Sequence, residues 1–220
     1  MRALLLLLIL ARPVAACDLA LLFAVDVSGS VDESEYRIQM EGLAWALEDA
    51  QVAEALIAGR SSLALLQWTG SSRQRLTVPW TTVTSQADLE NFAQEISEGE
   101  RVWRNFSTAI GEALSVGSGA FDDAPTCGRR LIDISSDGVS NAGVEPRHVQ
   151  DHLTRKAIGV NALVIEDATA GDLTGYFYEN VITGPGAFVV TAEGYADYPE
   201  KMRQKLLREV IQVMGFLTEP

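Results

Sequence analysis

Histidine and cysteine are scarce in this chain of 220 residues, which contains two of each. His148 and His152 have a spacing that occurs in metal sites on helices. However, His148 is followed by Val149 rather than by glutamate, so the H-E-x-x-H signature of metalloproteases is absent. We therefore interpret the two histidines as part of a solvated helix face, and the sequence does not support a histidine-based zinc site.

Basic residues and long apolar runs are also few. The chain has 17 lysines and arginines against 30 aspartates and glutamates, which gives a net charge of -13. Such a charge opposes binding to nucleic acid and to anionic membrane surfaces. Beyond the N-terminus, no apolar run approaches the ~20 residues that cross a bilayer. We therefore expect no nucleic-acid partner and no transmembrane span.

The N-terminus has the pattern of a secretory signal peptide. Residues 3–11 (ALLLLLILA) form an unbroken apolar run after Arg2, and residues 14–16 (VAA) supply small side chains for cleavage. We expect cleavage after Ala16, which leaves residues 17–220 as a single exported domain. Its location would be the periplasm or the extracellular space.

Export bears on the two cysteines, Cys17 and Cys127. In an oxidising compartment a pair of cysteines tends to form a disulfide. Residues 14–17 (VAAC) also resemble a lipobox, in which Cys17 would carry a lipid anchor instead. At this point both outcomes stand, and the disulfide is the one we favour.

Apolar runs alternate with helical patterns along the rest of the chain, without an internal repeat or a linker. This alternation predicts an α/β fold: a doubly wound, mostly parallel sheet with helices on both faces. We expect strands at residues 19–25, 63–68, 73–78, 130–134, 160–165 and 187–190. We expect helices at residues 34–57 (one or two), 85–97, 108–116, 146–156, 173–181 and 198–217.

The expected strand at 73–78 follows a short, turn-rich gap after the strand at 63–68. A parallel return needs a longer crossover, so the strand is predicted to be an antiparallel edge strand. Pro79 is expected to end it.

A cluster of oxygen-bearing side chains follows the first expected strand directly. Asp26, Ser28 and Ser30 alternate over five residues, and Gly29 allows a tight turn between them. Hard cations such as Mg²⁺ prefer oxygen ligands in octahedral array at about 2.0–2.1 Å. A loop at the end of a rigid strand can bring such oxygens to one point.

At this loop the chain resembles the von Willebrand factor type A (VWA) family, whose metal-ion-dependent adhesion site (MIDAS) begins with D-x-S-x-S. Residues 108–114 (TAIGEAL) resemble the family's T-x-x-G-x-A-L, and residues 132–138 (IDISSDG) resemble its strand that ends in [ST]-D-G. The resemblance covers residues 17–213. It implies that Asp26, Ser28, Ser30, Thr108 and Asp137 bind one Mg²⁺ or Mn²⁺, with Ca²⁺ as a further candidate.

One departure from the family pattern affects the hydroxyl ligand. Glycines or small residues commonly precede the threonine in the family, but here residues 104–107 (RNFS) do. Ser107 is therefore an alternative to Thr108. We favour Thr108 because Gly111 and the Ala-Leu pair after it fix the register of the motif.

The resemblance implies a binding module and not an enzyme. In the family, a carboxylate of the partner protein occupies the open coordination position of the metal. The alternative is a metal-assisted hydrolase that uses Asp26 and Asp137, which would need a nucleophile or general base beside the metal. The sequence offers no evident one.

A second resemblance is to an uncharacterised group of short, exported, single-domain VWA proteins of bacteria. It rests on the segments CDLAL at 17–21, APTC at 124–127 and YADYPEKMRQKLLR at 195–208. In the strand order that the VWA resemblance implies, the strands that lead to Asp26 and Asp137 are neighbours. Cys17 and Cys127 would then lie at the same far end of the sheet, which favours a disulfide.

Overall fold

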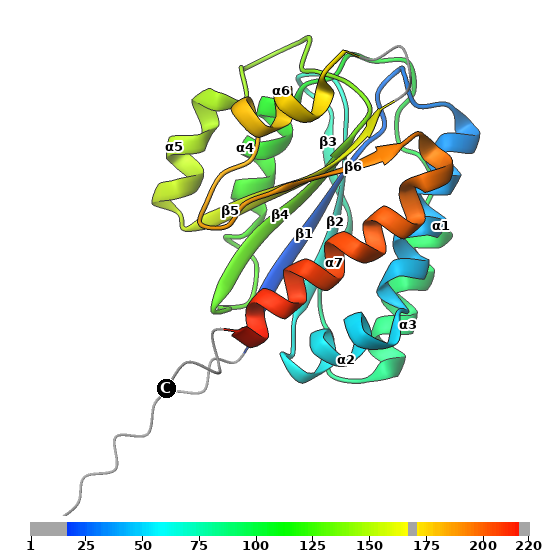
Figure 1. The fold of residues 1–220 in the computed structure, drawn as a ribbon, viewed down its shortest axis with the longest axis vertical. Helices are drawn as coiled ribbons and strands as arrows, with labels where there is room; N and C mark the ends of the chain where they lie inside the picture. Colours follow the sequence, from blue (N-terminus) through cyan, green and yellow to red (C-terminus); the bar gives the residue numbers. More distant parts are fainter. Residues whose placement is uncertain (1–16, 167–170, 216–220) are drawn as a thin grey trace, which may run out of the picture.

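The computed structural model describes residues 17–166 and 171–215, so the predicted signal peptide lies outside the described residues. Six strands form one sheet in the order β3-β2-β1-β4-β5-β6 (Figure 1). They are β1 (Leu19–Asp26), β2 (Ser62–Trp68), β3 (Gln74–Thr82), β4 (Arg129–Ser136), β5 (Ile158–Glu166) and β6 (Val189–Glu193). All neighbouring strands are parallel except β2 and β3. The predicted α/β fold, with one antiparallel edge strand, is confirmed.

Helices cover both faces of the sheet (Figure 1). One face carries α1 (Glu33–Leu47), α2 (Ala50–Ala58), α3 (Gln86–Ser97) and α7 (Tyr198–Gly215), and a short 3-10 helix, η1 (Tyr195–Asp197), leads into α7. The other face carries α4 (Ile110–Ala120), α5 (Arg147–Arg155) and α6 (Leu173–Asn180). Within residues 17–166 and 171–215, none of the helices combines the length and apolar character needed to cross a membrane.

Strand β1 lies near the middle of the sheet, and all of its residues are buried. Because side chains alternate along a strand, Leu21 and Phe23 enter the core under α1, α3 and α7, whereas Leu22 and Ala24 enter the core under α4. Full burial of a leucine or phenylalanine contributes roughly 1.5–3 kcal/mol. Both faces therefore fix the strand, and Asp26 at its end has a rigid support.

The expected end of β3 at Pro79 is wrong, because the strand continues to Thr82. Leu65 pairs with Val78 and Leu63 pairs with Thr81, so the register shifts between these two pairs. Pro79 lies at this irregularity on an edge strand, where a missing N–H is tolerated. Proline therefore interrupts the ladder locally without ending the strand.

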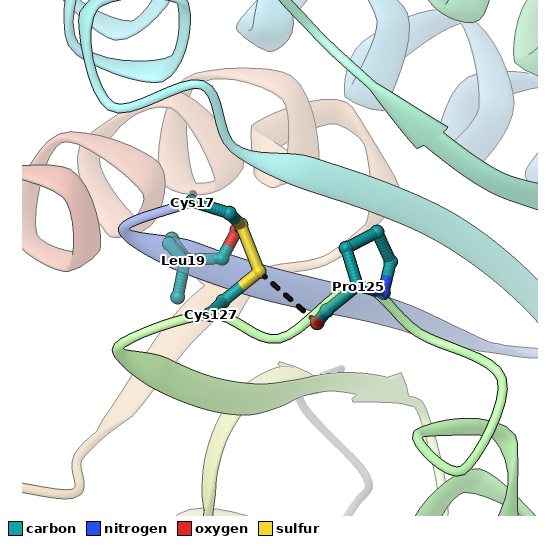
Figure 2. The surroundings of a disulfide bond; sticks show 4 residues. All are labelled: Cys17, Leu19, Pro125 and Cys127. Atoms are coloured by element: carbon teal, nitrogen blue, oxygen red, sulfur yellow. Dashed lines mark hydrogen bonds between the residues drawn. A yellow bond between two sulfur atoms is a disulfide. The ribbon is translucent and has the colours of Figure 1, made fainter. Parts of the chain in front are cut away.

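A disulfide joins Cys17 and Cys127 at the far end of the sheet (Figure 2). Their Cα atoms are 4.5 Å apart, although the residues are separated by 110 positions in sequence. Pairing of β1 with β4 aligns Leu19 with Arg129, which places the two cysteines opposite each other just before the strands begin. The predicted disulfide is present, and it uses the sulfur atom that a lipid anchor on Cys17 would need.

Candidate metal centre

The candidate centre lies at the carboxyl ends of β1 and β4, which are parallel neighbours. Asp26 is the last residue of β1, and Asp137 directly follows Ser136, the last residue of β4. The Ser136 hydroxyl donates a hydrogen bond to Asp26 Oδ2 across this edge. Two carboxylates from distant parts of the chain are thus brought to one point, as the sequence predicts.

The predicted hydroxyl groups form a continuous chain between these strands. Ser30 Oγ donates to Asp137 Oδ1 at 2.6 Å. The hydroxyls of Ser28 and Ser30 are 3.2 Å apart, and Thr108 Oγ1 donates to Ser28 Oγ at 3.2 Å. Asp26 is tied to the same loop, because its Oδ1 accepts the Ser28 N–H at 2.7 Å. All five predicted ligand residues therefore belong to one connected cluster.

The charge of this cluster is unbalanced within the protein. The Asp26 side chain is fully buried, and burial together with the nearby Asp137 raises its pKa to about 7, despite hydrogen bonds from Ser136 and Ser28. In residues 17–166 and 171–215, no lysine, arginine or histidine forms an ion pair with either carboxylate. A bound cation would supply the missing positive charge.

Thr108, and not Ser107, faces the cluster. The Thr108 side chain is buried against Ser28, and its backbone N–H donates to Asn141 Oδ1 at 2.9 Å. Ser107 is exposed, and its hydroxyl lies beside Gly70 instead. The Thr108 carbonyl also accepts the Asn141 N–H. The loop after β4 thus fixes the position of Thr108 through both of its backbone groups.

Hydrogen bonds to the backbone hold the metal loop, residues 26–30, in shape. Arg101 Nη2 donates to the carbonyls of Val27 and Ser28 at 3.0 and 2.8 Å. The Gly29 N–H donates to the Phe106 carbonyl at 2.7 Å, and a Cβ on Gly29 would lie 3.2 Å from that oxygen. Gly29 does not adopt a positive φ. It is therefore needed for close approach of the neighbouring loop rather than for the tight turn expected from the sequence.

Tyr195 is a member of the site that the sequence analysis did not assign. It lies on η1, and its hydroxyl donates to Asp137 Oδ2 at 2.8 Å. Burial and the adjacent Asp137 raise the pKa of Tyr195, so the phenol stays protonated and acts as a donor. No local pattern marks Tyr195, because the contact spans 58 positions of the chain.

The donor set fits a hard divalent cation. Two carboxylates roughly neutralise such an ion, while three hydroxyls add oxygen ligands without charge. In the described ranges there is no group of three or more histidine, cysteine, aspartate or glutamate side chains placed to hold a metal, and this includes His148 and His152. The hydroxyl-rich cluster is therefore the site to test.

The fold resembles those of several solved structures. Proximal thread matrix protein 1 from the mussel byssus, solved with a zinc-occupied MIDAS motif, has a TM-score of 0.66 at 19% identity, over 90% of this chain and 48% of that one. The pilus adhesin SpaC from Lactobacillus rhamnosus GG has a TM-score of 0.59 at 11% identity, over 90% of this chain and 30% of the adhesin chain. A von Willebrand factor type A protein from Catenulispora acidiphila has a TM-score of 0.60 at 15% identity, over 88% and 43%.

At these identities the likeness concerns the fold alone, and the chain spans less than half the length of each of these three structures. A comparison with curated protein sequences gives no significant match. Residues 16–214, by contrast, match the family described as "Protein of unknown function (DUF1194)". The chain therefore belongs to this family, and its fold is that of a von Willebrand factor type A domain.

Proposed function

We propose that this protein is an exported binding module that holds a protein partner through one divalent cation. The observation that carries the proposal is the junction of Asp26 and Asp137 with three hydroxyl groups at the end of the sheet. Asp26, Ser28, Ser30, Thr108 and Asp137 would hold Mg²⁺ or Mn²⁺, with Ca²⁺ as a third candidate. The cation, when bound, supplies an electrophilic centre for an acidic side chain of the partner.

The surroundings of the cluster support partner binding. Phe106, which contacts the metal loop, has 37% of its surface exposed, and Val139, just beyond Asp137, has 46%. Val144, whose carbonyl lies against Gly111, is exposed as well. Apolar side chains beside a charged centre are typical of a docking surface, because they add buried area around one oriented polar contact. The adhesin and byssus structures of the same fold support such a role.

Export is the second part of the proposal. The Cys17–Cys127 disulfide is stable in an oxidising compartment, and the N-terminal pattern at residues 1–16 predicts a signal peptide. Both favour the periplasm or the extracellular space. The mussel byssus protein and the pilus adhesin, which share the fold, fit this location.

The choice of hydroxyl ligand gives one prediction. Thr108→Val removes the hydroxyl that faces Ser28 and should lower Mg²⁺ affinity by at least tenfold, in the range of losses seen on perturbing metal sites. Ser107→Ala should leave the affinity unchanged, because that hydroxyl points to Gly70. Isothermal titration of both variants measures the difference, and the reverse order would assign the ligand to Ser107.

Tyr195 gives another prediction. Tyr195→Phe removes the hydrogen bond that orients Asp137, and loss of such a partner typically costs about 10–100-fold in metal affinity. Tyr178→Phe is the matched control, since Tyr178 is mostly exposed. Equal affinity in both variants, measured by titration calorimetry, would show that Tyr195 does not position the ligand.

The proposed function is tested by capture of partners from the exported protein fraction with immobilised wild-type protein. We expect proteins that are retained with Mg²⁺, released by a chelator and not retained by Asp137→Ala. Retention that is unchanged by the chelator and by the Asp137→Ala substitution would contradict a metal-mediated contact. Chelator-sensitive hydrolysis of phosphate, ester or peptide substrates, lost in Asp137→Ala, would favour the metal-assisted hydrolase instead.

A further inference from the structure

A second group of charged side chains is buried under α7, on the face of the sheet that α4 does not cover. Lys205 and Glu209 of α7 are completely buried, and Asp133 of β4 is 2% exposed. Lys205 Nζ lies 2.5 Å from Asp133 Oδ2 and 2.6 Å from Glu209 Oε1. Three ionisable groups thus meet in the core, and the half-buried Arg129, whose Nη1 donates to the Glu209 carbonyl at 3.1 Å, adds a fourth charge beside them.

The contact between Lys205 and Asp133 differs from an ordinary buried ion pair. Despite the short distance to Nζ, neither carboxylate oxygen of Asp133 accepts a hydrogen bond from any described residue. Buried carboxylates in stable ion pairs are normally hydrogen-bonded, because an unsatisfied buried acceptor is costly. The amine therefore lies within ion-pair distance of the carboxyl group but is poorly aligned as a hydrogen-bond donor to it.

Glu209 is held in contact with Lys205 by hydrogen bonds. Its Oε1 accepts hydrogen bonds from both Lys205 Nζ and Asn161 Nδ2, the latter at 2.8 Å. Asn161 is in turn fixed by the Phe188 N–H, which donates to its Oδ1. A carboxylate held by an amide and in contact with an amine can accept a proton from it.

The surroundings of Asp133 disfavour its ionised form. Burial raises the pKa of the Asp133 carboxyl and the nearby Glu209 adds to this shift, while Lys205 opposes it. The Phe188 ring lies 5.9 Å from Lys205 Nζ, and the buried Tyr198 lies on the same helix. Transfer of a proton from the ammonium to the carboxylate produces an uncharged amine beside an uncharged carboxylic acid.

We propose that Lys205 and Asp133 are joined by an intramolecular isopeptide bond, which forms with Glu209 as the proton carrier. The lone pair of Lys205 Nζ attacks Asp133 Cγ and forms the C–N bond. Glu209 accepts a proton from the nitrogen and delivers it to the hydroxyl of Asp133, which leaves with the electrons of the C–O bond as water. Amine and acid thus give an amide and one water, and Glu209 ends in its starting state.

The bond has a structural consequence. It removes an ammonium and a carboxylate from the core, which relieves the cost of burying them. It would also tie α7 covalently to β4, and the disulfide already joins the residues just before β1 and β4. The domain would then carry two covalent ties between distant elements.

Mass spectrometry tests the proposal on the purified full-length wild-type protein. Trypsin cuts after lysine and arginine, so the bonded protein should give residues 131–147 joined to residues 204–208, with a mass lower by one water than the sum of the two peptides. Recovery of residues 131–147 as a separate peptide at full mass, together with cleavage after Lys205, would overturn the proposal. This result is independent of any variant.

Variants then assign the roles. Lys205→Met and Asp133→Ala should each lack the joined peptide, and Lys201→Met, at a partly exposed position of α7, should retain it. Glu209→Gln should fold, as judged by near-ultraviolet circular dichroism, but remain unjoined. A joined peptide in Glu209→Gln at wild-type yield would overturn the role of Glu209, and Glu200→Gln is its matched control.

Discussion

We expect Asp26→Ala to abolish Mg²⁺ binding, measured as the loss of the calorimetric signal that the wild-type protein should give. The substitution removes one of two carboxylates in the cluster and leaves the Ser28 N–H and the Ser136 hydroxyl without their acceptor. With Mg²⁺ at 100 times its dissociation constant, the wild type should gain about 2.7 kcal/mol of stability. For a domain of this size that is roughly 5–10 °C in Tm, and the variant should gain nothing.

His148→Ala is the matched control for this experiment, because His148 belongs to the alternative metal spacing on α5. Its Mg²⁺ affinity and its thermal shift should equal those of the wild type. Unchanged affinity in Asp26→Ala would refute the assignment of the cluster. Loss of binding in His148→Ala would move the site to α5.

Replacement of both Cys17 and Cys127 by serine should cause the largest loss of stability that we expect. The disulfide closes a loop of 110 residues, for which chain entropy predicts a contribution of about 4–5 kcal/mol. The Tm should fall by roughly 10–20 °C in thermal unfolding. Because the bond lies at the far end of the sheet from Asp26, Mg²⁺ affinity below the Tm should be unchanged.

Reduction of the wild-type protein provides the control, since it should reproduce the stability of the double variant. Intact mass should show the loss of two hydrogens without an acyl group. A Tm that is the same with and without reductant would contradict a stabilising bond. A diacylglyceryl group on Cys17 would show that this residue carries a lipid anchor and not the disulfide.

The sequence predicts those parts of the site that lie in short segments directly beside a predicted strand or helix. The loop at 26–30, Thr108 and Asp137 each follow or precede an expected element, so their meeting point follows from the parallel sheet. The pairing of Cys17 with Cys127 follows in the same way, because equal distances along neighbouring parallel strands give equal heights.

Contacts made by single side chains over long distances could not be predicted. Tyr195 reaches Asp137 from η1, and Arg101 reaches the carbonyls of the metal loop, but neither has a local pattern. Asp133 lies within an apolar strand and Lys205 within an amphipathic helix, so their contact depends on how α7 packs on β4. The predicted end of the strand at Pro79 is wrong, because proline, which ends central strands, is tolerated on an edge strand.

The most direct test of the proposed metal centre is a crystal structure of the protein grown with Mn²⁺, with anomalous scattering recorded at the manganese edge. We predict a single anomalous peak bounded by Asp26, Ser28, Ser30, Thr108 and Asp137, with water or a carboxylate in the remaining coordination position. A peak at His148 and His152, or no peak at the cluster under saturating Mn²⁺, would contradict a metal centre at these five residues.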